Sequence, residues 1–227
     1  AVAENTPKQT LIKPSQSVKD VFLGLLAGMK ANRPVVLDRG LDAYFSPLDA
    51  FYVGILTSGT TGAPKCVWHR LDHLLGRIRT VDATHKWLLC YGSHSYAGLQ
   101  IILTACRSGG RLIADSSCSV PDLARVAVQQ SVTAISATPS FWRMFLMALK
   151  PDDKLDLSLI TLGGEAVDDA LLQRLRQMWP KAALRHIYAS TEAGAAFAVK
   201  DGRAGFPKVW LDEGVEGVKL KISDGLL

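Results

Sequence analysis

The chain has 227 residues, of which 48% are hydrophobic and 21% are charged, and its formal net charge is +5 at pH 7. This length fits one large domain, or one domain with a small appendage. The positive balance favours anionic ligands such as nucleotides, coenzyme A or an acidic carrier protein. Because the basic residues are scattered and no DNA- or RNA-binding signature is present, we expect no nucleic-acid partner.

The cysteines and the longest apolar stretches indicate the compartment. Cys66, Cys90, Cys106 and Cys118 are widely spaced and form no CxxC pair. The first three lie in apolar runs, which predicts buried free thiols rather than disulfides or metal ligands. No apolar stretch reaches membrane-spanning length, and the first ten residues lack the hydrophobic segment of a signal peptide. We therefore expect a cytoplasmic protein that does not enter a membrane.

Hydrophobic periodicity predicts an alternation of helices and short strands. The first helix is expected over residues 18–31, with Ser17 as its cap and one apolar face formed by Val18, Phe22, Leu25, Leu26 and Met29. Further helices are expected over residues 71–83, 99–106, 121–130, 140–149 and 168–179. Strands are expected at 34–38, 86–91, 110–114, 132–137, 157–162 and 183–189.

This alternation is typical of parallel βαβ units, so the predicted fold class is α/β, with a doubly wound, mostly parallel sheet and flanking helices. In such sheets ligands bind beyond the carboxyl ends of the strands. That rule places the loops after Thr57, Leu162 and Ala189 on one edge. Beyond residue 198, turn residues and apolar–polar alternation predict a β-rich tail, so we expect an α/β core over 1–198 and the start of a β-rich subdomain over 199–227.

The loop "TSGTTGAPK" (57–65) combines hydroxyl groups, glycines and a lysine. Donors from such a loop can surround a polyphosphate, because glycines let backbone N–H groups turn inward and the lysine supplies a cation. The spacing differs from that of a Walker A loop. A Gly/Thr-rich hairpin turn between two strands is the alternative interpretation of this loop. The residues concerned are Thr57, Ser58, Gly59, Thr60, Thr61, Gly62 and Lys65.

Two later stretches bear on that choice. "LITLGGEAV" (159–167) ends an apolar strand with Gly163, Gly164 and Glu165, where adjacent glycines allow close approach of a ring. It can equally be a strand-to-helix turn with Glu165 in the first turn of the helix. In "HIYASTEAG" (186–194), Tyr188 can stack on a base, Thr191 can donate to a phosphate and Glu192 can bind Mg²⁺. The alternative there is a helix-capping box.

Taken in order, these motifs resemble the adenylate-forming superfamily, which includes acyl- and aryl-CoA synthetases, peptide-synthetase adenylation domains and luciferases. "TSGTTGAPK" resembles the phosphate-binding loop of that family, "GGEAV" its adenine-flanking loop and "YASTE" its YGxTE motif. "YGSHSYAGL" (91–99) resembles the motif that lies between them. The resemblance extends from about Val53 to the end of the chain.

The resemblance implies ATP- and Mg²⁺-dependent activation of a carboxylic acid to an acyl-adenylate, with coenzyme A or a carrier-protein phosphopantetheine as acceptor. The loop over 57–65 would hold the β- and γ-phosphates through its hydroxyls and Lys65. Thr191 would contact the α-phosphate and Glu192 would bind Mg²⁺. Adenine would lie between Tyr188 and the backbone of Gly164 and Glu165. Gly163, Ala189 and Ser190 belong to the same expected cofactor-binding set.

His94 matches a histidine that lies beside the reacting carboxylate in many acyl- and aryl-CoA synthetases; the alternative is a core histidine. Amino-acid-activating relatives usually have an aspartate here, so the resemblance favours an aryl or aliphatic acid over an α-amino acid. The expected substrate pocket consists of His94, Ser95, Gly98, Ser136, Ala137 and Gly163.

The sequence departs from the family pattern in two respects. Ala189 replaces the glycine of YGxTE, and its methyl group has a cost only if that backbone needs a positive φ or close approach of a ligand. No ribose-binding aspartate, hinge or catalytic lysine follows within the 227 residues. We therefore expect a fragment, a compact enzyme, or a chain completed by a partner. The alternative from another class is a non-catalytic relative that binds nucleotide or acyl ligands or serves as an interaction module.

Overall fold

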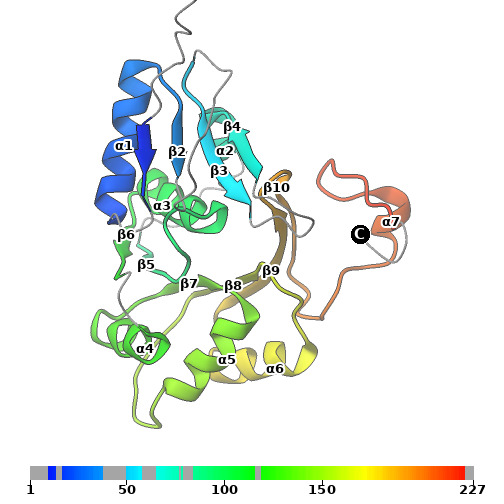
Figure 1. Cartoon of the computed structure of the whole chain (residues 1–227). Helices are drawn as coiled ribbons and strands as arrows, with labels where there is room; N and C mark the ends of the chain where they lie inside the picture. Colours follow the sequence, from blue (N-terminus) through cyan, green and yellow to red (C-terminus); the bar gives the residue numbers. More distant parts are fainter. Residues whose placement is uncertain are drawn as a thin grey trace, which may run out of the picture. The chain divides into compact units, whose positions relative to one another are not determined.

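The computed structural model describes residues 10–13, 17–37, 50–57, 65–76, 78, 84–115 and 119–222 (Figure 1). The chain divides into two compact units. The first consists of residues 1–84 and 91–116, and the second of residues 85–90 and 117–227. The α/β class is confirmed, because sheets and flanking helices alternate along the chain. The predicted boundary at residue 198 stays a prediction.

The first unit contains a sheet in the order β1-β2-β3-β4, in which β1, β2 and β3 are parallel and β4 is antiparallel to β3. The strands of this sheet are β1 (Thr10–Ile12), β2 (Val35–Leu37), β3 (Val53–Thr57) and β4 (Lys65–His69). The unit also contains β6 (Arg111–Ile113), which is not part of this sheet. Its helices are α1 (Val18–Ala31), α2 (Leu71–Gly76) and α3 (Tyr96–Ser108). The core of this unit joins side chains of α1, β2, β3 and α3.

Helix α1 packs on its sheet through glycines. A Cβ atom on Gly24 would lie 2.6 Å from Cδ1 of Ile12, and one on Gly28 would lie 2.2 Å from Cγ2 of Val35. These distances are far below van der Waals contact, so the missing side chains let the helix approach the strands closely. The face that carries the glycines is therefore the buried face.

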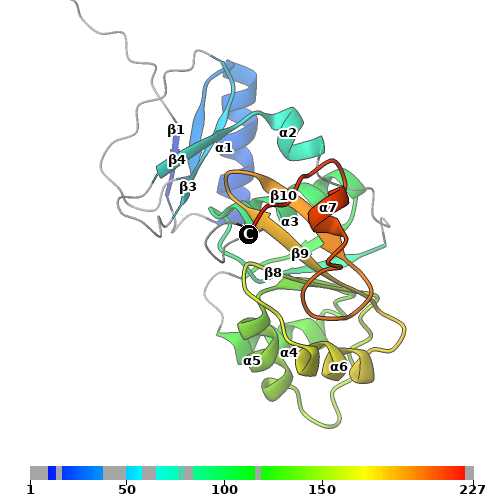
Figure 2. The same cartoon turned by 90° about the vertical axis from the view of Figure 1, so that its right-hand side faces the viewer.

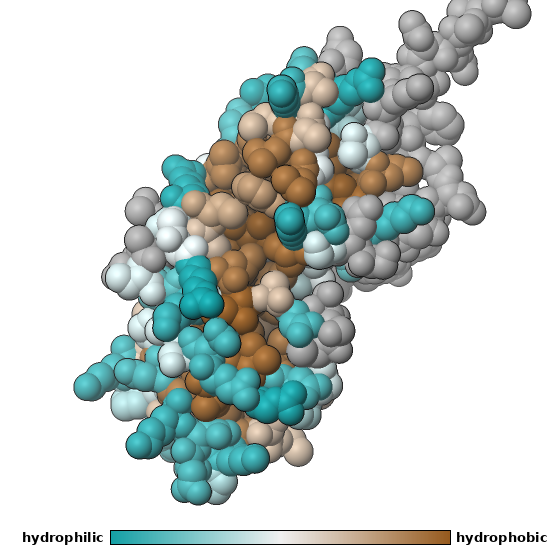
Figure 3. Space-filling view, turned by 90° about the vertical axis from the view of Figure 1, so that its left-hand side faces the viewer, coloured by the Kyte–Doolittle hydropathy of each residue, from teal (hydrophilic) through white to brown (hydrophobic). Residues whose placement is uncertain are grey.

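The apolar face predicted for α1 is therefore not the buried face of the helix. Of its five members only Leu25 is buried, whereas Leu26 and Met29 are 40% and 47% exposed. Leu23 of the same helix is 50% exposed. Figure 3 shows the side of the molecule on which apolar side chains of α1 reach the surface. Periodicity of large side chains identified the helix correctly and its buried face incorrectly.

The second unit contains a sheet in which neighbouring strands follow the order β10-β9-β8-β7-β5. Strands β5, β7, β8 and β9 are parallel, and β10 is antiparallel to β9. The strands are β5 (Lys86–Leu89), β7 (Ala134–Ala137), β8 (Leu159–Gly163), β9 (Ala183–Ser190) and β10 (Gly194–Val199). The helices are α4 (Val120–Gln129), α5 (Pro139–Ala148), α6 (Asp169–Met178) and α7 (Trp210–Glu213). Helices α4, α5 and α6 lie on one side of these strands (Figure 1).

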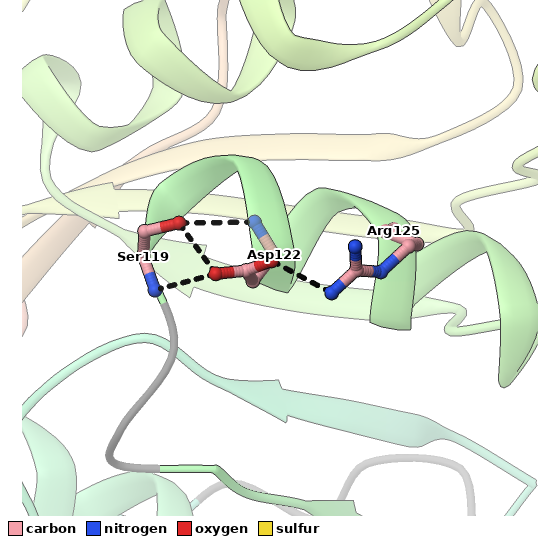
Figure 4. Close-up of polar contacts among 3 residues, drawn as sticks. All are labelled: Ser119, Asp122 and Arg125. Carbon is pink, nitrogen blue, oxygen red and sulfur yellow. Dashed lines mark hydrogen bonds and ion pairs between the residues drawn. The ribbon is translucent and has the colours of Figure 1, made fainter.

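Side-chain caps define where several helices begin. Ser119 caps α4, and its hydroxyl and backbone N–H both contact the carboxylate of Asp122, which also pairs with Arg125 (Figure 4). Ser17 forms the same capping box at α1, as expected. Ser95 caps α3, so this helix begins three residues earlier than predicted. These caps satisfy N–H groups that the helix itself leaves unbonded.

Two predicted elements are shorter or absent. Of the helix expected over 71–83, the structure has α2 up to Gly76, and Ile78 is not helical. Residues 77 and 79–83 lie outside the described residues. The β-rich tail is also wrong where the structure describes it, since residues 200–222 form α7 and one isolated bridge between Val215 and Val218. Glycines with positive φ at 202, 205, 214 and 217 interrupt this segment, which breaks the extended backbone that alternation alone had suggested.

The cysteines are free, as expected, at the three positions that the structure describes. Burial raises the pKa of the Cys66 thiol to about 11 and raises that of Cys90 further. The expectation of burial is wrong for Cys106, which is exposed on α3. Its helix turns its buried face, with Leu99 and Leu103, toward the core of the first unit. Cys118 lies outside the described residues.

Candidate functional site

The carboxyl ends of β7, β8 and β9 bring together most of the predicted residues of the second unit. Ala137 pairs with Leu162, and Gly163 pairs with Ile187. Ser136 and Ala137 therefore end β7, and Gly163 ends β8 and is followed by Gly164 and Glu165. Tyr188 to Ser190 end β9 and are followed by Thr191 and Glu192. For the loops after β8 and β9, the predicted common edge is confirmed.

The third loop belongs to a different sheet. Strand β3, which precedes the loop after Thr57, pairs with β2 and β4 in the first unit. The prediction that one sheet carries all three loops is wrong, because helix–strand alternation does not reveal where one sheet ends and another begins. His94, Ser95 and Gly98 also belong to the first unit.

Glu165 is anchored to helix α5 rather than to the helix that follows it. Its Oε2 accepts a hydrogen bond of 2.9 Å from the backbone N–H of Ser140, in the first turn of α5. Helix α6 begins only at Asp169, so the interpretation that placed Glu165 in its first turn is wrong. A carboxylate at a helix N-terminus is stabilised by unbonded N–H groups and by the helix dipole. The side chain therefore fixes the loop that carries the two glycines.

A second anchor lies at the other end of the same loop. Asp168 caps α6 by accepting from the backbone N–H of Leu171 at 2.8 Å, and it also pairs with Arg143 of α5. The pKa of Asp168 is lowered mainly by the hydrogen bond from the backbone N–H of Leu171 and next by the hydrogen bond from Arg143. Glu165 and Asp168 thus tie both ends of the loop to α5. Sequence reasoning missed Ser140 and Arg143, because each lies 25 residues from its partner.

We expect low pH to weaken the hydrogen bond between Ser140 and Glu165. Hydrogen bonds from Ser140 lower the pKa of Glu165, so the stabilisation is fully present above the ordinary carboxyl pKa near 4.5 and is lost as pH falls through the lower folded value. We expect Glu165→Gln to lower the free energy of unfolding by about 0.5 kcal/mol at pH 7, since the group is exposed. Urea unfolding at pH 7 and pH 3 checks this. A difference that persists at pH 3 would contradict it.

Gly164 has a left-handed backbone conformation. Its φ is +83°, and among the described residues a Cβ built there would have one neighbour within 4 Å, a methyl carbon of Thr138 at 3.7 Å. Only glycine adopts this conformation without strain. The residue is exposed, so a flat ring can approach its backbone.

Tyr188 is half-buried, and one face of its ring is already occupied. Phe197 of β10 stacks on it with ring centroids 4.6 Å apart and an interplanar angle of 18°. Burial raises the pKa of the Tyr188 phenol. A bulge between Ala195 and Phe197 sets Phe197 opposite Tyr188 in the ladder. A ligand base can therefore stack only on the other face.

The end of β9 turns directly into β10. Ser190 accepts a hydrogen bond of 3.0 Å from the N–H of Ala193, and residues 191–193 form a turn, so the helix-capping interpretation is wrong. Thr191 is half-exposed and Glu192 is exposed on this turn. Ala189 lies in the strand without a positive φ, and its methyl group therefore causes no backbone strain.

In the first unit, β3 and β4 flank the expected phosphate loop as an antiparallel pair, with Thr57 opposite Lys65. The Thr57 hydroxyl donates to the Lys65 carbonyl at 3.4 Å, and Lys65 is exposed. The hairpin topology of the alternative interpretation is thus present, and it is compatible with a phosphate-binding turn. Ser58, Gly59, Thr60, Thr61 and Gly62 lie outside the described residues.

The segment before α3 is tightly packed. The Ser95 hydroxyl accepts from Gly98 N–H at 3.0 Å and donates to the Gly92 carbonyl at 2.8 Å. A Cβ on Gly98 would lie 2.1 Å from that carbonyl oxygen. Close packing against the backbone of Gly92 therefore requires a glycine at position 98. This requirement does not depend on whether Gly98 also lines a substrate pocket. His94 is half-buried, and its ring packs over Gly92.

Other candidate sites in the second unit do not coincide with these residues. A pocket of about 600 Å³ lies at the beginning of β9, lined by Arg176, Pro180, Ala182, Ala183, Leu184, Arg185 and Lys200.

Among the described residues, no group of three or more His, Cys, Asp or Glu side chains is arranged to hold a metal ion. In the same ranges no helix is long and apolar enough to cross a membrane.

The sequence model of the AMP-binding enzyme family matches residues 9–219. The chain therefore belongs to the AMP-binding enzyme family, whose members are adenylate-forming enzymes. The D-alanine–D-alanyl carrier protein ligase of Bacillus licheniformis is 31% identical over 159 residues, which cover 65% of this chain and 32% of the ligase. The p-hydroxybenzoic acid–AMP ligase FadD22 of Mycobacterium tuberculosis is 22% identical over 208 residues, covering 87% and 30%. The chain spans about a third of the length of these relatives.

Solved structures share the fold. The o-succinylbenzoate coenzyme A synthetase of Bacillus subtilis, in complex with ATP and magnesium ion, gives a TM-score of 0.59 at 17% identity and covers 85% of this chain and 51% of that structure. The complex of VinN with L-aspartate gives 0.61 at 18% identity, with 86% and 66% covered. At these identities the likeness shows the fold alone.

Proposed function

We propose that this chain activates a carboxylic acid with ATP and Mg²⁺, giving an acyl-adenylate and pyrophosphate. The thiol of coenzyme A or of a carrier protein's phosphopantetheine would then take the acyl group as a thioester, and the acyl–phosphate bond would break to release AMP. The main support is that two loops of the matched family's pattern, "GGEAV" and "YASTE", lie on adjacent strand ends of one sheet. A cytoplasmic location, where ATP and coenzyme A are available, belongs to the same proposal.

The residues of the second unit fit the adenosine half of ATP. The exposed backbone of Gly164 has no Cβ, so a flat ring can approach it closely. The free face of Tyr188 offers an aromatic surface. Stacking on such a ring is worth roughly 1–3 kcal/mol per base and needs no particular hydrogen-bond pattern. We assign adenine to these groups, with Thr191 beside the α-phosphate.

The reaction requires that negative charge be held on the departing pyrophosphate. A carboxylate oxygen of the acid forms a bond to the α-phosphorus, and the bond from that phosphorus to the bridging oxygen breaks. Lys65, with the hydroxyls of the adjoining loop, would bind the phosphates that leave. Glu192 is an exposed carboxylate suited to Mg²⁺, which supplies charge neutralisation when bound.

The proposed acid has no α-ammonium group, because His94 occupies the place expected for a charge-pairing aspartate. Two relatives differ on this point, since one is named for D-alanine and the other for p-hydroxybenzoic acid. The Bacillus relative has the higher sequence identity, but its alignment covers a smaller share of this chain. Substrate class is therefore the variable that the experiment must resolve.

Acid-dependent exchange between ATP and pyrophosphate tests the function. The unmodified chain would be assayed with aryl acids, aliphatic acids and amino acids, D-alanine included. We expect exchange with one class of acid lacking the ammonium group. Lys65→Ala should lower the exchange rate by about 100-fold, because it removes a cation from the leaving group. Lys19→Ala, an exposed change on α1, is the matched control.

The outcomes separate the hypotheses. Exchange with amino acids only would overturn the assignment of the acid and leave adenylation standing. No exchange, together with ATP binding in calorimetry, would favour the non-catalytic nucleotide-binding module. Neither exchange nor ATP binding would overturn the proposal entirely.

A further inference from the structure

Four aromatic rings of the second unit form one cluster around Tyr188. We call it the Tyr188 cluster, and its members are Tyr188, Phe197, Phe206 and Trp210. Phe206 meets the Tyr188 ring edge-to-face at 5.5 Å, and Trp210 meets Phe197 in the same way at 5.5 Å. Phe206 and Trp210 are stacked at 6.2 Å with an angle of 8°. Figure 2 shows β9, β10 and α7, the elements from which three of these rings come.

A hydrogen bond from His186 holds the outer part of the cluster in place. Its Nε2 lies 2.7 Å from the carbonyl oxygen of Gly205, and since a carbonyl can only accept, Nε2 bears the proton. The side chain is 4% exposed, and its buried Nδ1 has no hydrogen-bond partner within the described part of the chain. The imidazole also lies 5.7 Å from the Tyr188 ring. His186 therefore touches both the tyrosine and the segment that carries Phe206.

Two further bonds attach the same segment to α6. Asp169 accepts from the N–H of Ala204 at 2.7 Å, and Arg176 donates to the carbonyl of Asp201 at 3.0 Å. Residues 201–206 are thus fixed from one side by α6 and from the other by β9. Phe206 is consequently held in a defined position against Tyr188.

We infer that Phe206 and His186 are positioning residues that set the orientation of the Tyr188 ring for nucleotide binding. This inference rests on the proposed function. Phe197 and Phe206 restrict the tyrosine from one face and from an edge, so the free face is presented in one orientation. Fixing a side chain before binding lowers the entropy cost of binding. The expected ligand is the adenine ring of ATP or AMP.

A purely structural role makes a different prediction. If the cluster only packs residues 201–210, loosening it would lower stability and leave nucleotide affinity unchanged. Phe145 provides the matched comparison, because it is fully buried in α5 and meets Trp142 edge-to-face at 5.6 Å. It belongs to a separate group of rings that does not include Tyr188.

The test compares Phe206→Leu with Phe145→Leu by calorimetric titration with AMP and ATP and by exchange kinetics. We expect Phe206→Leu to weaken nucleotide affinity about tenfold and to raise KM for ATP with kcat changed less than threefold. Phe145→Leu should lower the unfolding midpoint and leave affinity unchanged. Equal affinity in Phe206→Leu and the unmodified chain would overturn the inference.

A second pair of variants covers the case in which Phe206→Leu does not fold. His186→Gln retains a donor for Gly205, whereas His186→Leu removes it. We expect weaker AMP binding in His186→Leu and recovery in His186→Gln, and equal binding by the two would contradict the positioning role. Failure of the unmodified chain to bind AMP or ATP is a separate result, which would overturn the proposed function and this inference with it.

Discussion

Gly98→Ala should lower the free energy of unfolding by about 2–3 kcal/mol. The added Cβ would lie 2.1 Å from the carbonyl oxygen of Gly92 and 2.8 Å from its carbonyl carbon. That carbonyl cannot move easily, because it accepts from both the N–H and the hydroxyl of Ser95. Urea unfolding monitored by circular dichroism measures the change. The substitution should also loosen the start of α3.

Gly76→Ala is the matched control for this prediction. Gly76 is the last residue of α2, and no atom of the residues that the structure describes lies within 4 Å of a Cβ built there. Alanine should therefore leave stability unchanged or raise it by up to about 1 kcal/mol. A Gly98→Ala chain with unchanged stability and altered acid preference would show instead that Gly98 is small to make room for substrate.

Glu192→Gln should lower the rate of ATP–pyrophosphate exchange by at least about 100-fold. The amide has the shape of the carboxylate but lacks the charge that Mg²⁺ prefers. Because Glu192 is exposed in the turn between β9 and β10, folding should be little affected. The assay would be repeated over a range of Mg²⁺ concentrations, since a weakened metal site should need more of the ion.

Glu213→Gln serves as the control, because Glu213 is also exposed in the second unit but lies on α7. It should retain the exchange activity of the unmodified chain. Activity of Glu192→Gln within threefold of the unmodified chain at every Mg²⁺ concentration would remove Glu192 from the proposed metal site.

Local signals in the sequence predicted most elements but not how some of them pack. Ser17 and the apolar spacing after it predicted α1 from Val18 to Ala31, its observed bounds. The buried face was missed because the helix packs through Gly24 and Gly28, which add nothing to an apolar pattern. The C-terminal segment was misjudged because apolar alternation cannot show that Gly202 and Gly205 have positive φ.

For the candidate site, sequence motifs located the loops but not the contacts that hold them. The order of β8 and β9 followed from βαβ alternation, so Gly163 and Tyr188 were expected near one edge. The hydrogen bond from Ser140 to Glu165 could not be predicted, because Ser140 follows β7 and Glu165 follows β8, 25 residues later. The stacking of Phe197 on Tyr188 depends on a bulge, and no local pattern in β10 indicates one.

That bulge also affects how this strand should be aligned with related chains. In a regular ladder, Ala196 would face Tyr188, because Ala195 pairs with Ala189. Because of the extra residue, every later pair in the ladder is displaced by one residue of β10, so that Val199 is opposite His186. An ungapped alignment with a homologue that lacks the bulge would match Ala196 to the residue facing the motif tyrosine. A one-residue gap between 195 and 197 restores the correct correspondence.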